Sequence, residues 1–386
     1  MNNEMKILVV DDHPIHLTVM KKHLAKIEYL QVDTEQDPFV ALNMLSACQF
    51  DVIFCDIDMP KLDGIDFMLS LNEMKFLGHV VLVSALERSI IEAVSAMCQS
   101  FSFNILGKIQ KPYDLEELSK LLSTAHILMK QKTFFRRNVE VTDQEFLIDL
   151  VNGRVKNYYQ PLVDCMSGEV VGYEALARWQ HRIYGLLTPA VFLPIVERCN
   201  LSLELFDVVA DNAVKDTKQH YLDKRISINA DQTNIEDPLF SERFINKCLE
   251  NGVEPEKFTI EITENTSFSN SVSLYRNLAK LRLYDVNVSI DDFGTGYSSF
   301  EKLSLLPFNE LKIDRSFVSD MTNDSKKRKI INSICGLAKS LDLIIVAEGV
   351  ENQSTWEMLQ SYDIDICQGF LFNKPMPLEA INILSV

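Results

Sequence analysis

Acidic residues stand where short apolar runs end in the first part of the chain. Asp11 and Asp12 follow the run Ile7–Val10, and Asp56 follows the run Val52–Cys55. Three converging carboxylates repel one another unless a cation lies among them, and such an oxygen-rich set suits Mg²⁺. An aspartate carboxylate can also act as a nucleophile toward a phosphoryl group. These acids therefore predict a magnesium site at which an aspartate could act as a nucleophile toward a phosphoryl group.

Two further side chains are expected beside this pocket. Ser84 ends another apolar run, Val80–Val83, and the pair Lys111-Pro112 follows a later one. The Lys111 ammonium and the metal would offset charge on a phosphoryl group, and the Ser84 hydroxyl could donate a hydrogen bond to its oxygens. A lone Asp-Asp pair is common in proteins, but the joint order of all these residues is far more specific.

The second half of the chain also places polar side chains at or just after strand-like segments. These residues are Glu174, Asn229, Glu261, Glu264, Asp291, Asp292, Lys312, Asp314, Glu348, Glu351 and Gln368. So many acids in one place cannot all stay ionised without cations, so two Mg²⁺ or Mn²⁺ ions are expected. Two metals about 3.5–4 Å apart are a known arrangement for cleaving phosphodiesters. No Cys or His clusters with these residues, which argues against a zinc hydrolase.

Neighbouring residues in a strand point to opposite faces, and this sets a condition on Asp291 and Asp292. Both carboxylates are expected to reach metals if the strand ends at Asp291, but not if it continues. Lys312 and Asp314 share one strand face, so they could contact the same water or oxygen.

The elements that would position these residues differ between the two halves. Residues 1–126 have strand runs that are apolar at consecutive positions, separated by amphipathic stretches such as 16–27 and 90–97. This pattern predicts a doubly wound α/β domain whose parallel sheet is covered on both faces, with its site at the carboxyl ends of the strands. Residues 127–142 are rich in Lys and Arg and are expected to form a helical linker.

Residues 143–386 have strands with period two. In segments such as 258–263 and 286–291, apolar residues alternate with polar ones, and helical patterns such as 271–283 and 329–341 lie between the segments. Each strand therefore has an apolar face and a polar face that ends in a functional group. This arrangement is typical of a βα-barrel with its site at the C-terminal face.

Composition and charge limit the class of protein. The chain has 386 residues, of which 47% are hydrophobic and 24% charged, as in folded domains. No apolar run approaches the ~18–20 residues of a membrane span, so no membrane insertion is expected. The 8 cysteines are scattered singly, which favours reduced thiols and a cytoplasmic location. The net charge of −17 opposes duplex binding, so no DNA partner is expected.

The motifs of residues 1–126 are Asp11-Asp12, Asp56-x-x-Met59-Pro60, Gly64, Ser84 and Lys111-Pro112. In this order they resemble the receiver domain of two-component response regulators, which is flavodoxin-like. The resemblance implies that a sensor histidine kinase or phosphotransfer protein phosphorylates Asp56, and that Ser84 and Lys111 sense the phosphoryl group. It also implies one Mg²⁺ or Mn²⁺ ion, assisted by Asp11, Asp12 and the Asp58 carbonyl. Receivers often carry an aromatic residue three positions before the lysine, where this chain has Lys108.

A second set of motifs covers residues 143–386. The motifs are Tyr159-Gln160-Pro161, Glu174-Ala175-Leu176-Ala177-Arg178-Trp179, Asn229, Glu261-Ile262-Thr263-Glu264, Asp291-Asp292-Phe293-Gly294-Thr295-Gly296, Leu311-Lys312-Ile313-Asp314, Glu348-Gly349-Val350-Glu351 and Gln368-Gly369-Phe370. They resemble the EAL-domain cyclic-di-GMP phosphodiesterases. The resemblance implies a TIM-like (β/α)8 barrel, in which one strand can be antiparallel, that hydrolyses cyclic di-GMP to linear 5′-pGpG.

The same resemblance implies a role for each residue. The metal ligands would be Glu174, Asn229, Glu261, Asp291, Asp292 and Asp314, with Asp291 bridging the two ions. Lys312 would orient the attacking water, and Glu348 would be either the general base or part of the metal shell. The substrate contacts would be Gln160, Arg178 and Gln368, and the loop-bracing residues would be Glu264 and Glu351.

Three functions remain open: a phosphorylation-regulated phosphodiesterase, a non-catalytic cyclic-di-GMP receptor that signals through a partner, and a receiver-controlled scaffold or transcription regulator. Lys312 and Glu348 favour the enzyme, because binding alone would not require them. The chain has no convincing helix-turn-helix pattern and no GGDEF-type synthase motif. A homodimer or higher homo-oligomer is expected.

Overall fold

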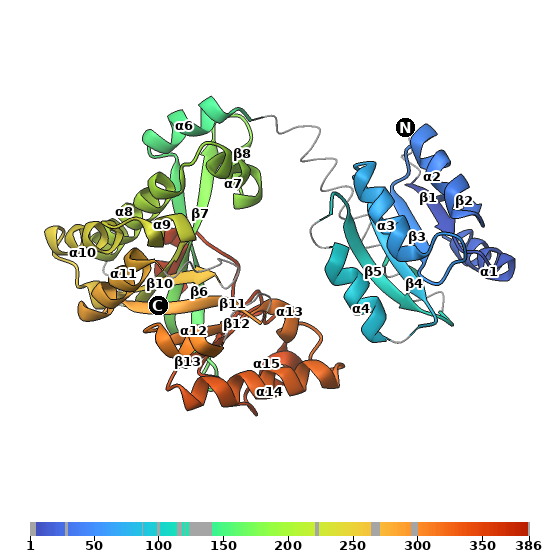
Figure 1. The fold of residues 1–386 in the computed structure, drawn as a ribbon. Coiled ribbons are helices and arrows are strands. Elements are labelled where there is room, and N and C mark those ends of the chain that lie inside the picture. Colours follow the sequence, from blue (N-terminus) through green and yellow to red (C-terminus); the bar gives the residue numbers. More distant parts are fainter. Residues whose placement is uncertain are drawn as a thin grey trace. The chain divides into compact units, whose positions relative to one another are not determined.

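A computed structural model describes residues 5–27, 30–86, 88–98, 101–113, 118–119, 121–122, 141–220, 224–263, 271–294 and 300–384. The chain divides into two compact units, Met1–Glu140 and Val141–Val386 (Figure 1). Of the expected linker 127–142, only Val141 and Thr142 are described; the rest of it, with its expected helix, lies outside the described residues. Among the described residues, no helix combines the length and apolarity that a membrane span requires.

The first unit is a five-stranded parallel sheet with helices between its strands. The strands are β1 (Met5–Val10), β2 (Leu30–Glu35), β3 (Val52–Asp56), β4 (His79–Ser84) and β5 (Asn104–Gln110), and the helices are α1 (Pro14–Leu24), α2 (Pro38–Ala47), α3 (Gly64–Glu73) and α4 (Arg88–Met97). The strand order β2-β1-β3-β4-β5 is that of flavodoxin-like folds. The expected doubly wound fold is therefore confirmed.

Both faces of this sheet are covered, which explains why its central strands are apolar at consecutive positions. Ile7 and Val9 of β1 pack in one cluster with Leu17 of α1. Their neighbour Leu8 packs in a separate cluster with Phe67 of α3. Burial on both faces leaves the strand ends as the place where polar side chains of these strands can reach solvent.

The second unit is a closed barrel of eight strands. They are β6 (Val155–Asp164), β7 (Val170–His181), β9 (Arg225–Ala230), β10 (Phe258–Thr263), β11 (Asn287–Phe293), β12 (Glu310–Ile313), β13 (Ile344–Ala347) and β14 (Ile366–Gln368). A short strand, β8 (Gly185–Leu187), is added to the edge of β7. Pairing of β6 with β7 closes the ring, and β6 is antiparallel to both of its neighbours. The TIM-like fold is confirmed, including its one reversed strand.

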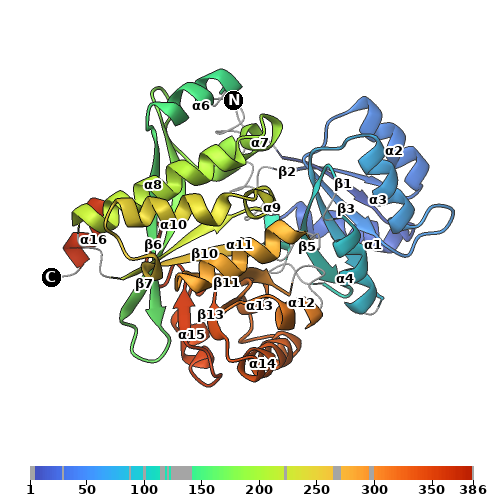
Figure 2. The same ribbon diagram turned by 60° about the vertical axis from the view of Figure 1, so that its left-hand side comes forward.

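Helices surround this barrel (Figure 2). They are α6 (Asp143–Val151), α7 (Pro189–Arg198), α8 (Ser202–His220), α9 (Gln232–Glu236), α10 (Phe240–Glu250), α11 (Val272–Leu283), α12 (Phe300–Leu305), α13 (Arg315–Val318), α14 (Ser325–Ser340), α15 (Gln353–Leu359) and α16 (Leu378–Leu384), with a 3₁₀ turn η2 (Pro255–Lys257). Their starts follow sequence signals. Thr142 and Glu145 form a capping box on α6, and Ser271 caps the start of α11.

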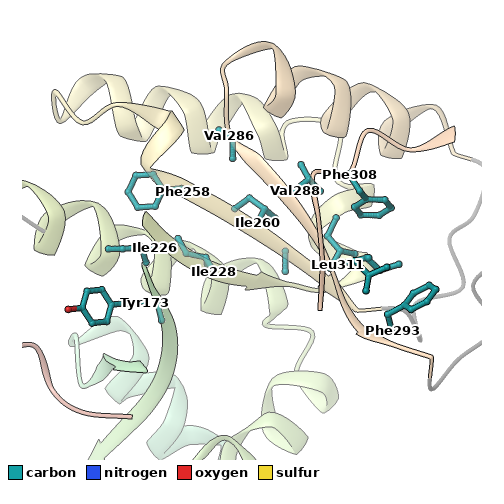
Figure 3. Close-up of a cluster of buried hydrophobic side chains, with 14 of the residues drawn as sticks. Tyr173, Ile226, Ile228, Phe258, Ile260, Val286, Val288, Phe293, Phe308 and Leu311 are labelled. Atoms are coloured by element: carbon teal, nitrogen blue, oxygen red, sulfur yellow. The ribbon is translucent and has the colours of Figure 1, made fainter. Parts of the chain in front are cut away.

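The apolar face of the barrel strands packs against the helices, and the polar face points to the barrel axis. Ile260 of β10 pairs in register with Ile228 of β9 and Val288 of β11, and all three belong to the core shown in Figure 3. The residue after Ile260 is Glu261, which is buried on the opposite face. Because the faces alternate, each strand can carry a functional side chain inward while it anchors the barrel outward.

A backbone contact at the end of β14 predicts one stability effect. A Cβ on Gly369 would lie 2.0 Å from the backbone oxygen of Val350, whereas a Cβ on Gly336, exposed in α14, would meet nothing within 4 Å. Gly369→Ala should therefore lower the free energy of unfolding by about 1–3 kcal/mol through overpacking. Gly336→Ala should raise it by about 0.5–1 kcal/mol through helix propensity.

Urea unfolding followed by tryptophan fluorescence checks this prediction, because both tryptophans, Trp179 and Trp356, lie in the second unit. Equal effects of the two glycine substitutions would contradict it.

Candidate active site

Strand register brings the inward-facing polar residues of the barrel to one level. Glu261 of β10 lies beside Asn229 of β9, and Thr263 of β10 lies beside Asp291 of β11. These are the carboxyl ends of parallel strands, so their side chains meet at the same end of the barrel. The structure therefore gathers acids that are far apart in the sequence.

The side chain of Lys312 lies at the centre of these acids and is buried. Its Nζ is 2.6 Å from Glu348 Oε1, 2.9 Å from Glu261 Oε2 and 3.3 Å from Asp291 Oδ1. Burial alone would lower the pKa of this lysine, but the surrounding carboxylates hold the pKa well above its ordinary value. Lys312 is therefore a fixed positive charge at the floor of the site.

Glu174 is held by two amides. Its Oε1 accepts a hydrogen bond of 2.8 Å from Asn229, and its Oε2 accepts one of 2.6 Å from Gln368. Burial acts to raise the pKa of Glu174, but the charge of Lys312 and the two amide hydrogen bonds outweigh burial and leave the pKa lowered. Glu174 is thus kept as a carboxylate with a fixed orientation.

Asp291 and Asp292 reach the same place through a β-bulge. Strand β11 continues to Phe293, so the strand does not end at Asp291, which was the condition set for both carboxylates to reach metals. The pairing with β12 shifts register between Ile290 and Phe293, and Asp292 has a φ of 55°. The extra residue turns its side chain out of the usual alternation. Carboxylate oxygens of Asp291, Asp292 and Glu348 consequently lie within 4.8 Å of one another.

The chemistry of this cluster fits a hard divalent cation. The side-chain atoms that could bind a cation are oxygens, and Glu261 Oε1 is buried without a hydrogen-bond partner. Burial and the neighbouring acids raise the pKa of Asp292 to about 6 and the pKa of Glu348 to about 8. A bound cation therefore stabilises these crowded carboxylates more than it would stabilise carboxylates that lie far apart.

The remaining residues expected in this site lie around it. Asp314 follows β12, caps α13 and interacts with the carboxyl of Asp292. Arg178 of β7 is half-buried and donates a hydrogen bond of 2.8 Å to the Ala177 carbonyl. Glu264 lies outside the described residues.

A pocket of about 280 Å³ opens above the acids. Its lining includes Gln160, Glu174, Leu176, Asp291, Arg315, Glu348, Gly349, Glu351, Gln368, Gly369 and Phe370. Gln368 donates a hydrogen bond of 3.3 Å to Gln160, so two of the expected substrate contacts lie side by side. Arg178 is not among the described residues that line this pocket.

Sequence reasoning assigned no role to five of the lining residues, which are Leu176, Arg315, Gly349, Gly369 and Phe370. Phe370 is half-exposed at the pocket, and its place in the Gln368-Gly369-Phe370 motif was the signal that could have identified it. Arg315 donates a hydrogen bond of 2.6 Å to Glu351, which shows what Glu351 contacts. No sequence pattern indicated this pair, because it joins the first residue of α13 to the loop that follows β13.

The first unit brings together a second charged cluster. Lys111 Nζ lies 2.6 Å from Asp56 Oδ2, 2.7 Å from Asp11 Oδ2 and 3.0 Å from the Nδ1 of His16. Burial raises the pKa of Asp56, and Lys111 offsets only part of this effect. The acids Asp11 and Asp56 with His16 could also hold a metal ion, since one ligand atom of each lies within 4.8 Å of the others.

The other residues expected in the first unit lie near this cluster. Asp12 follows Asp11 and is partly exposed, while Asp58 is exposed and donates its backbone N–H to Asp56 Oδ1 at 3.3 Å. Ser84 is buried, and its hydroxyl accepts a hydrogen bond from the Leu86 N–H. Lys108, at the position where receivers often have an aromatic residue, is exposed. His16 was missed by sequence reasoning, although its place in the first turns of α1 follows from its spacing to Asp11.

The central position of Lys312 predicts a stability effect that depends on metal. Lys312→Met removes the cation from among buried carboxylates, so without metal the free energy of unfolding should fall by about 3–5 kcal/mol. Added Mg²⁺ should recover more stability in this variant than in the wild type, because the metal replaces the missing charge.

Urea unfolding in EDTA and in Mg²⁺ tests this prediction. The matched control is Lys339→Met, which removes an exposed lysine that pairs with an exposed acid, Asp363, and should change little. Loss of stability that Mg²⁺ does not reduce would contradict the prediction.

Comparison with known families agrees with the two units. A model described as EAL domain matches residues 143–375, and a model described as response regulator receiver domain matches residues 7–123. Among curated proteins, the chain is 30% identical to the cyclic di-GMP phosphodiesterase RocR of Pseudomonas aeruginosa, over 97% of each chain. It is 36% identical to the bifunctional diguanylate cyclase/cyclic di-GMP phosphodiesterase MucR of the same species, over 58% of this chain and 33% of that one.

Solved structures resemble the second unit. The MucR phosphodiesterase in complex with c-di-GMP is 35% identical, with a TM-score of 0.59, and the match covers 62% of this chain and all of that one. An EAL domain protein from Listeria monocytogenes is 31% identical, with a TM-score of 0.58, over 64% of this chain and 98% of the other. The chain therefore belongs to the EAL-domain family, among the response regulators in which a receiver domain precedes the EAL domain.

Proposed function

We propose that this protein is a cyclic-di-GMP phosphodiesterase that opens its substrate to linear 5′-pGpG, and that phosphorylation of Asp56 regulates it. The observation that carries the proposal is the buried cluster of Glu174, Glu261, Asp291 and Glu348 around Lys312, at the floor of a pocket. A relative that is similar over 97% of both chains is a cyclic di-GMP phosphodiesterase, which supports the same substrate.

The residues that would hold two divalent ions are Glu174, Asn229, Glu261, Asp291, Asp292 and Asp314. When bound, Mg²⁺ or Mn²⁺ ions would lower the pKa of water and offset negative charge on the phosphodiester. The protein supplies an oxygen-rich site and holds Glu174 in one orientation through Asn229 and Gln368.

The other side chains bind the substrate and handle the proton. Gln160 and Gln368 contact the substrate in the pocket, and the Arg178 guanidinium binds a phosphate. Lys312 orients the attacking water, and Glu348, 2.6 Å from the lysine, accepts the proton of that water. The water oxygen forms a bond to phosphorus while the bond from phosphorus to O3′ breaks. The O3′ oxygen takes up a proton as it leaves, and Glu348 gives up the proton that it accepted, so the product keeps the phosphate on O5′ and gains a free 3′-hydroxyl.

The first unit is proposed to be the regulatory part. A phosphotransfer partner would donate a phosphoryl group to the Asp56 carboxylate. Asp11 and Asp12 with the Asp58 carbonyl would hold a divalent ion, which would supply positive charge to offset that of the phosphoryl group. Lys111 is already within hydrogen-bond distance of Asp56, so it can follow the new phosphoryl oxygens. Phosphorylation changes the turnover rate only if it biases two conformations of the chain.

Turnover of cyclic di-GMP is the direct test of the activity. Purified protein with Mg²⁺ or Mn²⁺ should convert cyclic di-GMP to pGpG, as followed by liquid chromatography. Glu174→Ala should reduce the rate by more than about a hundredfold, because loss of a metal's outer-shell partner alone costs ~10–100-fold. Glu197→Ala, which removes an exposed glutamate on α7, is the matched control. Tight binding of cyclic di-GMP without turnover would instead indicate a receptor.

Phosphorylation has its own test. Acetyl phosphate with Mg²⁺ should add one phosphoryl group to the wild type, as seen by intact-mass spectrometry, and Asp56→Asn should abolish the addition. Asp66→Asn, which changes an exposed aspartate on α3, should leave it intact. The turnover rate of the wild type, but not of Asp56→Asn, should change after this treatment. Equal phosphorylation of both proteins would exclude Asp56 as the acceptor.

A further inference from the structure

Trp179, the residue after Arg178 in β7, is fully buried between the barrel and two helices. Its ring lies edge-on to Phe146 of α6 at 5.2 Å and to His181 of β7 at 4.9 Å. Phe146 stacks in turn on Phe192 of α7 at 5.3 Å. We call this enclosure, formed by Phe146, Asp149, His181 and Phe192, the Trp179 pocket.

Asp149 is the residue of this enclosure that forms a hydrogen bond with the indole ring of Trp179. The indole N–H of Trp179 donates to Asp149 Oδ2 at 3.0 Å, and Asp149 is only 4% exposed. Its other oxygen lies 3.2 Å from the Nε of Arg154. An apolar side chain would pack here without the cost of burying a charge. Asp149 instead fixes the orientation of the indole ring, because a hydrogen bond is directional.

The orientation of Trp179 bears on the site because Arg178 is its neighbour. Successive residues of a strand point to opposite faces, so Trp179 faces the helices while Arg178 faces the same side as Glu174. In register, Arg178 pairs with Lys156 and Trp179 pairs with Val155, both at the start of β6. This end of β7 extends past its pairing with β9, and the short β8 pairs with it only from Trp179 onward, so the described strands give Arg178 a ladder partner on one side. The helix-side anchor therefore limits how the backbone presents Arg178.

Helix α6 is the first described element after residues 123–140. Its start is held by the capping box of Thr142 and Glu145, and Asp143 pairs with Arg198 of α7. Asp149, six residues after Asp143 in the same helix, accepts the hydrogen bond of Trp179. The helix that follows the receiver unit in the chain is thus joined by a buried hydrogen bond to the strand that carries Glu174 and Arg178.

We propose that Asp149 is a positioning residue for substrate binding: by orienting Trp179 from α6, it sets the place from which Arg178 binds a phosphate of the substrate. This inference rests on the proposed function. If Asp149 has this role, a conformational change in the residues before α6 can alter substrate affinity through α6. Asp149 does not touch substrate or metal.

The test compares Asp149→Leu, Asp149→Asn and Trp179→Phe, each in full-length protein that also carries Trp356→Phe, so that Trp179 is the single tryptophan where present. Asp149→Leu should raise the KM for cyclic di-GMP by about tenfold, because about one hydrogen bond to a charged group is lost. The kcat of this variant should stay within about twofold of the parent value. Asp149→Asn should stay near the parent, because its amide oxygen still accepts from the indole. Trp179→Phe should reproduce Asp149→Leu, and the double variant should be no worse than either.

Two controls separate positioning from general damage. Asp143→Asn changes the same helix and the same residue type without touching Trp179, and its KM should equal that of the parent. The emission spectrum of Trp179 should shift in Asp149→Leu but not in Asp149→Asn. Mn²⁺ binding, followed by electron paramagnetic resonance, should be unchanged in all variants.

Three results would overturn the inference: an unchanged KM in Asp149→Leu, an equal KM rise in Asp143→Asn, or additive effects of Asp149→Leu and Trp179→Phe. If the parent binds cyclic di-GMP without turnover, the catalytic part of the proposed function fails, and the same comparisons are made on Kd. If the parent neither binds nor turns over the substrate, the inference and the proposed function fail together.

Discussion

Buried carboxylates that crowd together need positive charge among them, and the second unit is arranged around this constraint. Lys312 supplies that charge at the bottom of the barrel mouth, with acids of three other segments within 3.3 Å of its Nζ. These segments are separated by many residues in the chain, so the ammonium links parts that only folding brings together. Removal or addition of positive charge at this point therefore affects binding, chemistry and stability at once.

The first unit meets the same constraint with the same type of side chain. Lys111 lies between Asp11 and Asp56, as Lys312 lies among the barrel acids. In both units the lysine and the acids follow from parallel strands whose carboxyl ends meet. The difference lies in the setting, since Lys111 stands at the edge of an open sheet and Lys312 inside a closed barrel.

Sequence patterns located most of the site because alternation has a simple physical cause. Helices cover one face of each barrel strand, so residues such as Glu261 and Lys312 must lie on the other face. Alternation alone did not place Asp292, because a bulge belongs to a pair of strands and not to one strand's pattern. Arg315 and His16 were missed for a related reason: their contacts are made across loops or from the first turns of a helix. Such contacts depend on where elements pack, which local periodicity does not encode.

The reversed direction of β6 has a consequence for how such proteins are assembled from domains. In a barrel with all strands parallel, the first strand begins at the end opposite the catalytic mouth. Here β6 runs the other way, and its first residue, Val155, pairs with Trp179 at the catalytic end of β7. The chain consequently enters the barrel beside the chemistry. Any module fused ahead of such a barrel, whatever signal it senses, is therefore joined through α6 to the substrate-binding end and not to the opposite end.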